Sequence, residues 1–162
     1  MSTPLLVLVG PPASGKTTVG TALADVLGAD FRDTDHDIES STGSSVPDLF
    51  VSEGEPYFRA LEEQAVAAAL VQHGGVLALG GGAVLDPDTR GLLAGHRVVF
   101  LRVGLADAVK RVGLGTSRPL LLGNVRARIK ALLDERTPVY ESVAVVTVDT
   151  DGRPAEEVAA EV

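Results

Sequence analysis

The chain has 162 residues, of which 45% are hydrophobic, and its 14 basic and 22 acidic side chains leave a formal charge of −8. This composition excludes a disordered chain, and the negative charge disfavours nucleic acid or an anionic membrane surface as the main partner. The length predicts a single domain over residues 1–162, and the absence of cysteine, of a basic leader and of a membrane-length apolar run predicts a cytoplasmic protein.

The first predicted elements enclose a phosphate-binding motif. An apolar run over residues 5–9 predicts a buried strand, a helical pattern covers 17–27, and residues 10–17 between them read GPPASGKT, a match to G-x-x-x-x-G-K-[ST]. In such a loop Lys16 can reach the β- and γ-phosphates and the Thr17 hydroxyl can ligate Mg²⁺. The alternative is a glycine-rich turn that binds nothing, and such a turn has no use for Lys16. We expect contacts to ATP from Pro12, Ala13, Ser14, Gly15, Lys16, Thr17 and Thr18.

Strand and helix patterns alternate along the rest of the chain. In chain order they are a strand at 29–32, short helices within 36–52 broken at Gly43 and Pro47, a long helix at 55–72, a buried strand at 76–79, a short helix from 86, a strand at 98–101, a helix at 105–112, a glycine-bounded loop at 113–123, a helix from an Asn124 cap to about 135, a strand at 143–148 and a helix opened by Pro154. The long helix has its predicted apolar face at Leu61, Ala65, Ala68 and Ala69. Five strands alternating with helices predict an α/β fold with a parallel sheet covered on both faces.

Two aspartates follow the second predicted strand. Ligands of open parallel sheets bind beyond the carboxyl ends of the strands, and phosphoryl transfer needs one carboxylate near Mg²⁺ and one near the acceptor hydroxyl. We assign Asp33 to the metal, through water, and Asp35 to the acceptor hydroxyl as a base or orienting group. The spacing leaves open a helix N-cap role for Asp35, and we expect His36 and Asp37 on the solvated surface.

Glycines and arginines supply the remaining candidates. Gly81 and Gly82, which with Gly80 follow a buried strand, could offer N–H donors to an anion, the alternative being a flexible turn. Arg59 and Arg136 could each hold a carboxylate bidentately, although exposed ion pairs are the commoner role of helix arginines. Arg118, in the glycine-bounded loop, could reach a transferring phosphate.

Together these motifs resemble the shikimate kinase family: GPPASGKT at 10–17, DTD at 33–35, FR at 58–59, LGGGAV at 79–84, RPLL at 118–121 and RTPVY at 136–140. The resemblance implies a three-layer P-loop fold with sheet order 2-3-1-4-5, and a monomer with a shikimate-binding region at about 33–61 and a mobile lid at about 113–123. It also implies transfer of the ATP γ-phosphoryl group to the 3-hydroxyl of shikimate, with Mg²⁺, on the route to chorismate and aromatic amino acids.

By matching positions, the resemblance implies a role for each candidate. Catalysis falls to Lys16, Asp35 and Arg118, and Mg²⁺ binding to Thr17 and Asp33. Shikimate would be held by Asp35, Arg59, Gly80, Gly81, Gly82 and Arg136, and ATP additionally by Arg111, Arg118 and Arg153. The alternatives are a gluconate or nucleoside monophosphate kinase, neither of which predicts all six motifs, and a non-catalytic ATP-binding module, which would need neither Asp35 nor Arg118.

Overall fold

A parallel five-stranded sheet forms the centre of the molecule. The computed structural model describes residues 3–11, 14–114 and 122–162. The strands are β1 (Leu6–Val9), β2 (Phe31–Asp33), β3 (Val76–Ala78), β4 (Val98–Arg102) and β5 (Val146–Asp149). Their order is β2-β3-β1-β4-β5, which confirms the predicted order, and β1 pairs in parallel with both β3 and β4.

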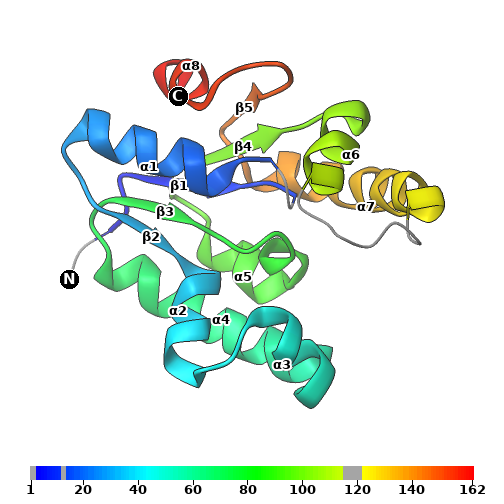
Figure 1. Cartoon of the computed structure of the whole chain (residues 1–162). Coiled ribbons are helices and arrows are strands. Elements are labelled where there is room, and N and C mark those ends of the chain that lie inside the picture. Colours follow the sequence, from blue (N-terminus) through cyan, green and yellow to red (C-terminus); the bar gives the residue numbers. More distant parts are fainter. Residues whose placement is uncertain (1–2, 12–13, 115–121) are drawn as a thin grey trace.

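Helices cover both faces of this sheet. They are α1 (Lys16–Leu27), α2 (Thr34–Thr42), α3 (Val46–Glu53), α4 (Glu55–Gln72), the 3-10 turn η1 (Ala83–Leu85), α5 (Pro87–Leu92), α6 (Leu105–Leu114), α7 (Leu122–Val143) and α8 (Ala155–Glu161). In Figure 1, α1 and α8 lie on one side of the strands and α4 and α5 on the other. No helix in the described part of the chain has the length and apolar character needed to cross a membrane.

Side chains of each strand point alternately to the two faces of the sheet, and each face carries its own hydrophobic core. In β1, Val7 and Val9 pack with α4 and α7, whereas Leu8 packs with α1 and α8. Successive side chains of a strand point to opposite faces, so a continuous apolar run is what a doubly covered strand requires. This packing brings the carboxyl ends of the strands together at one edge, where the loops that carry the predicted motifs meet.

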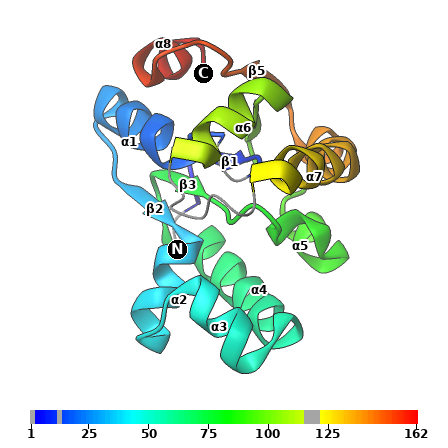
Figure 2. The ribbon, with the colours of Figure 1, turned by 45° about the vertical axis from the view of Figure 1, so that its right-hand side comes forward.

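Helix α4 has a broader buried surface than its sequence pattern predicts. The fully buried positions include Phe58, Val66 and Leu70, whereas the predicted Leu61 and Ala65 are only partly buried. Val66 and Leu70 face the sheet, while Leu61 and Ala65 pack against the core of a small lobe formed with α2 and α3. Figure 2 shows this lobe standing below the sheet, with α4 passing from one to the other.

Two helix boundaries near prolines differ from the predicted ones. Pro47 lies in the first turn of α3, where its missing N–H has no partner to lose. Gly43, at φ 72°, ends α2, and Ser45 caps the start of α3. Helix α7 begins before Asn124 and continues through Pro138 to Val143, well beyond the predicted end near 135. The last strand consequently starts at Val146 rather than 143.

Tertiary packing explains the extension of α7. Its last turns carry Tyr140, which is fully buried against Phe100 of β4, with ring centroids 5.1 Å apart. Burial of a large aromatic side chain outweighs the backbone hydrogen bond that Pro138 removes. The predicted loop at 113–123 is also shorter at both ends, because α6 reaches Leu114 and α7 starts at Leu122.

Candidate functional site

The phosphate loop joins the end of β1 to the start of α1. Gly10 leaves no room for a side chain, since a Cβ there would lie 2.7 Å from the Leu101 carbonyl oxygen and 2.9 Å from Ser14 Oγ. Gly15, at φ 87°, takes a left-handed conformation at the N-terminus of α1, and no described side chain caps that end. The helix therefore presents free N–H groups and its positive end to an anion, as the motif predicts. Pro12 and Ala13 lie outside the described residues.

Lys16 lies at the centre of the loop. Its Nζ donates to the carbonyl oxygens of Gly10 at 2.7 Å and Pro11 at 3.0 Å. Burial lowers the pKa of Lys16 to about 8, and the charges of Asp35 and Asp33 oppose that change. The ammonium group is thus positioned between the phosphate loop and the two aspartates that follow β2.

Thr17 and Asp33 form an oxygen pair beside the loop. Thr17 Oγ1 donates to Asp33 Oδ2 at 3.3 Å, and Asp33 Oδ1 accepts from the Asp35 N–H at 2.9 Å. Asp33 is therefore the N-cap of α2, and the alternative that made Asp35 the cap is wrong. A hydroxyl and a carboxylate next to a phosphate site are the hard oxygen ligands that Mg²⁺ takes, so these residues fit the metal.

Asp35 is a partly buried carboxylate with an unusual environment. Its Oδ1 is shielded from solvent and accepts no hydrogen bond from any described residue. Burial, followed by the charges of Asp33 and Glu62, raises the pKa of Asp35 to about 6. An unpaired buried acceptor is costly and rare, and it is typical of groups that bind a substrate.

One cleft connects the loop to this carboxylate. Its volume is about 310 Å³, and it is lined by Gly15, Lys16, Thr17, Thr18, Asp33, Asp35, Leu79 and Gly81. The structure therefore brings together residues from the first, second and third strand ends that the sequence analysis named. Of the two neighbours of Asp35 expected on the surface, His36 is exposed, whereas Asp37 is partly buried and pairs with Arg32 at 2.6 Å.

Two of the three glycines after β3, Gly80 and Gly82, make room for charged side chains. A Cβ on Gly80 would lie 2.5 Å from Asp35 Oδ1 and 2.8 Å from a Glu62 oxygen, and a Cβ on Gly82 would lie 2.5 Å from an Arg59 nitrogen. Any larger residue would displace groups of the site itself. This close approach of the protein's own side chains adds a reason for the glycines to the ligand contact that the sequence analysis expected.

Arg59 is fixed by a buried partner that the sequence analysis missed. Its Nη1 donates to Glu62 Oε1 at 2.7 Å, and its guanidinium lies over the rings of Phe50 and Phe58 at 5.6 and 5.5 Å. Glu62 is only 3% exposed, and its burial raises its pKa while Arg59 opposes the rise. The i, i+3 spacing on α4 was the signal available in the sequence.

Arg136 reaches the same region from α7. Its charge lowers the pKa of Lys16 and opposes the raised pKa values of Glu62 and Tyr140. One turn further along the helix, the Tyr140 hydroxyl donates to the Gly81 carbonyl oxygen. Arg59 and Arg136 therefore act on the same group of residues from two different helices, an arrangement suited to one carboxylate ligand.

A second cleft adjoins the other side of the phosphate loop. It measures about 250 Å³ and is lined by Ser14, Gly15, Thr18, Val19, Arg111, Thr150, Arg153, Ala155 and Val158. Arg111 donates to the Thr150 carbonyl oxygen at 2.9 Å, and Arg153 donates to the Asp149 carbonyl oxygen at 2.7 Å. The two arginines predicted for the adenine side thus share one cleft. Arg118 lies outside the described residues.

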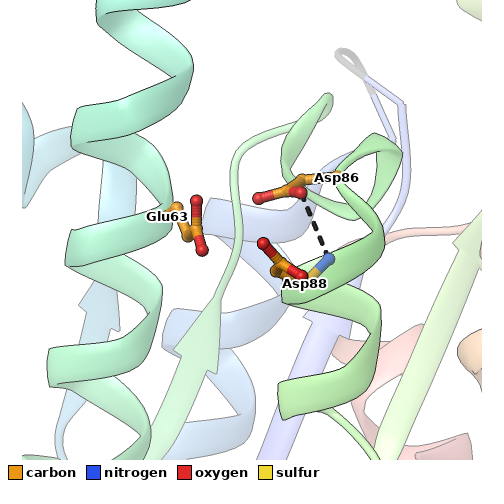
Figure 3. Close-up of side chains that lie close together, drawn as sticks. All are labelled: Glu63, Asp86 and Asp88. Carbon is orange, nitrogen blue, oxygen red and sulfur yellow. Dashed lines mark hydrogen bonds between the residues drawn. The ribbon is translucent and has the colours of Figure 1, made fainter.

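A group of three carboxylates lies apart from these clefts. Glu63 of α4 faces Asp86 and Asp88 at the start of α5 (Figure 3). Asp86 caps α5, because its Oδ1 accepts from the Asp88 N–H at 3.1 Å and its Oδ2 from the Thr89 hydroxyl at 3.3 Å. Capping accounts for the position of Asp86, and we assign no ligand to this group.

Comparisons with known proteins agree on one family. A family model described as shikimate kinase matches residues 12–162. The chain is 60% identical over 159 residues to a shikimate kinase of Salinispora arenicola, covering 98% of this chain and 95% of that protein. It is 61% identical over 158 residues to a shikimate kinase of Thermobifida fusca, covering 98% and 92%.

Solved structures give the same result. A shikimate kinase from Acinetobacter baumannii, in complex with shikimate, matches with a TM-score of 0.90 and 36% identity over 99% of this chain and 90% of that one. A gluconokinase from Sinorhizobium meliloti matches with a TM-score of 0.55 and 21% identity over 99% and 88%, a likeness of fold alone. This chain belongs to the shikimate kinase family.

Proposed function

We propose that this chain transfers the γ-phosphoryl group of ATP to the 3-hydroxyl of shikimate, giving shikimate 3-phosphate and ADP on the route to chorismate and the aromatic amino acids. The observation that carries the proposal is the single cleft shared by Lys16, Thr17 and Asp35. In-line phosphoryl transfer requires donor phosphate and acceptor hydroxyl to meet in one place, and this cleft joins a phosphate loop to a carboxylate. Membership of the family supports ATP and Mg²⁺ as donor and metal.

Asp35 receives the acceptor hydroxyl. Its side chain lines this cleft, and with a pKa of about 6 it is ionised at neutral pH yet able to take up a proton. As the acceptor oxygen bonds to the γ-phosphorus and the bond to ADP breaks, the hydroxyl proton passes to Asp35. A carboxylate tied up in a salt bridge would be less basic, so the absence of a cationic hydrogen-bond partner among the described residues favours this role.

The phosphate side relies on positive charge and N–H groups. Lys16 would exchange its two loop carbonyls for phosphate oxygens, and the N–H groups of residues 13–18 would surround the β-phosphate. Thr17 and Asp33 would hold Mg²⁺, which neutralises charge on the phosphates when bound. Arg118 is proposed to add positive charge at the transferring group, and Arg111 and Arg153 to line the adenine side.

The other end of the acceptor would be held by its carboxylate. Arg59 and Arg136 supply two guanidinium groups, and the Gly81 and Gly82 N–H groups have no acceptor among the described residues. Asp35 would therefore bind the hydroxyl at one end of the acceptor, and the two arginines would bind the carboxylate at the other. We further propose a cytoplasmic monomer whose residues 33–61 form the acceptor-binding region. Most of the lid expected at 113–123 lies outside the described residues.

A coupled assay of ADP release tests this function. We expect turnover with ATP, Mg²⁺ and shikimate, and background rates with gluconate or a nucleoside monophosphate. Turnover on gluconate or a nucleotide in place of shikimate would contradict the proposal in favour of a related small-molecule kinase. ATP binding without shikimate-dependent ADP release would instead favour a non-catalytic nucleotide-binding module.

A further inference from the structure

Tyr140 is a buried side chain with no part in the mechanism described above. Its ring belongs to the main core, packed on Phe100, and its hydroxyl donates to the Gly81 carbonyl oxygen. Burial raises the pKa of Tyr140, which keeps the hydroxyl protonated and therefore a donor. Phenylalanine would fill the same space, so the hydroxyl and not the ring calls for a specific explanation.

The glycine segment, residues 80–82, uses most of its backbone groups within the protein. The Gly80 N–H donates to Thr34 Oγ1 at 3.1 Å. The Gly80 and Gly82 carbonyl oxygens accept from the Ala83 and Leu85 N–H groups, each at 3.1 Å. The Gly81 carbonyl oxygen accepts from the Tyr140 hydroxyl. The Gly81 and Gly82 N–H groups meet no acceptor in the described part of the chain. A buried segment with two free donors is prepared for an acceptor that comes from outside.

The bond from Tyr140 determines where one of these donors points. The Gly81 C=O and the Gly82 N–H belong to one peptide unit, and in a trans peptide these two groups point in opposite directions. Holding the carbonyl on α7 therefore turns the Gly82 N–H away from α7. Gly82 itself packs against the Arg59 guanidinium, on the other side of the segment.

We propose that Tyr140 is a positioning residue for acceptor binding: its hydroxyl holds the Gly81–Gly82 peptide so that the Gly82 N–H is presented to the acceptor's carboxylate. This inference rests on the proposed function. Tyr140 lies four residues after Arg136, on the same face of α7, so one helix would supply a guanidinium directly and a backbone N–H indirectly. The arrangement would make the position of the glycine segment depend on that of Arg136.

Two acceptors, one with a charged carboxylate and one with a neutral ester in its place, test the role. Tyr140→Phe is assayed with shikimate and with its methyl ester, whose neutral ester gains less from an N–H donor. We expect kcat/KM for shikimate to fall about tenfold, the loss typical of a misplaced hydrogen bond to a charged group. The kcat/KM for the ester and the KM for ATP should each change less than about twofold. Because both acceptors are assayed on one preparation, their ratio does not depend on the fraction of protein that folds.

An exposed hydroxyl on the same helix is the matched control. Ser142 of α7 donates to the Val139 carbonyl oxygen at 2.7 Å, and Ser142→Ala is expected to leave kcat/KM for both acceptors unchanged. Equal falls in kcat/KM for shikimate and for its ester, or no fall for shikimate, would show that Tyr140 only fills the core. Either result would overturn the inference. Wild-type protein without shikimate-dependent ADP release would instead overturn the proposed function, and this inference with it.

Discussion

Replacing Asp35 with asparagine is expected to remove most of the turnover and at the same time to stabilise the fold. The pKa of Asp35 is raised from 3.8 to about 6, a change of about two units. Since one unit corresponds to about 1.4 kcal/mol, the ionised carboxylate costs the folded state about 3 kcal/mol above pH 7. Asparagine keeps the shape and removes the charge, so it should recover most of this free energy.

The stability gained by Asp35→Asn should increase with pH. Because the pKa is higher in the folded than in the unfolded state, the folded state binds more protons between about pH 4 and 6, and the cost of the charge grows as the pH rises through this window. The gain from Asp35→Asn in urea unfolding without nucleotide should be about 3 kcal/mol at pH 8 and only about 1 kcal/mol at pH 4.5. Turnover with shikimate should fall by at least about a hundredfold, while ATP binding is retained.

Asp37→Asn is the control for this experiment. Asp37 is paired with Arg32 at 2.6 Å, so removing its charge should not stabilise the protein at either pH. A gain for Asp35→Asn that is the same at pH 8 and pH 4.5, or no gain at all, would refute the reasoning from burial and like charge. Near-normal turnover of the variant would refute the assignment of Asp35 to the acceptor hydroxyl.

Three further substitutions separate the two halves of the site. Gly80→Ala should raise the KM for shikimate and leave ATP binding unchanged, because the added Cβ would lie 2.5 Å from Asp35 Oδ1 and 2.8 Å from a Glu62 oxygen; a normal KM would contradict this. Arg136→Ala should weaken shikimate binding by about 2–5 kcal/mol, since it leaves a carboxylate without a partner, and an unchanged titration would refute it. Arg111→Ala should weaken ATP binding severalfold by calorimetry with no effect on shikimate, because Arg111 lines the cleft beyond the phosphate loop.

Several features of the acceptor half were not predictable from the sequence. Glu62 reads as one more acidic residue of a helix, and only its position between Arg59 and the glycine segment makes it a buried partner. Tyr140 was part of a recognised motif, yet its hydrogen bond spans 59 residues, a separation that no local pattern encodes. The prediction that the helix now labelled α7 ends near residue 135 was wrong for the same reason. Long-range packing of Tyr140 lets the helix continue through Pro138.

The sequence by itself determined the α/β fold class and the phosphate loop. Both depend on local rules: apolar runs of strand length, glycines at a tight turn, and a lysine and threonine at fixed spacing from them. The strand order was implied by the resemblance to a known family and not by these local rules. Only the tertiary structure decided that Asp33 and not Asp35 caps α2, that Asp35 Oδ1 is left unpaired, and that the arginines of α4 and α7 both act on Glu62. Those outcomes depend on burial and on charges from distant segments, which become neighbours only when the sheet brings its strand ends together.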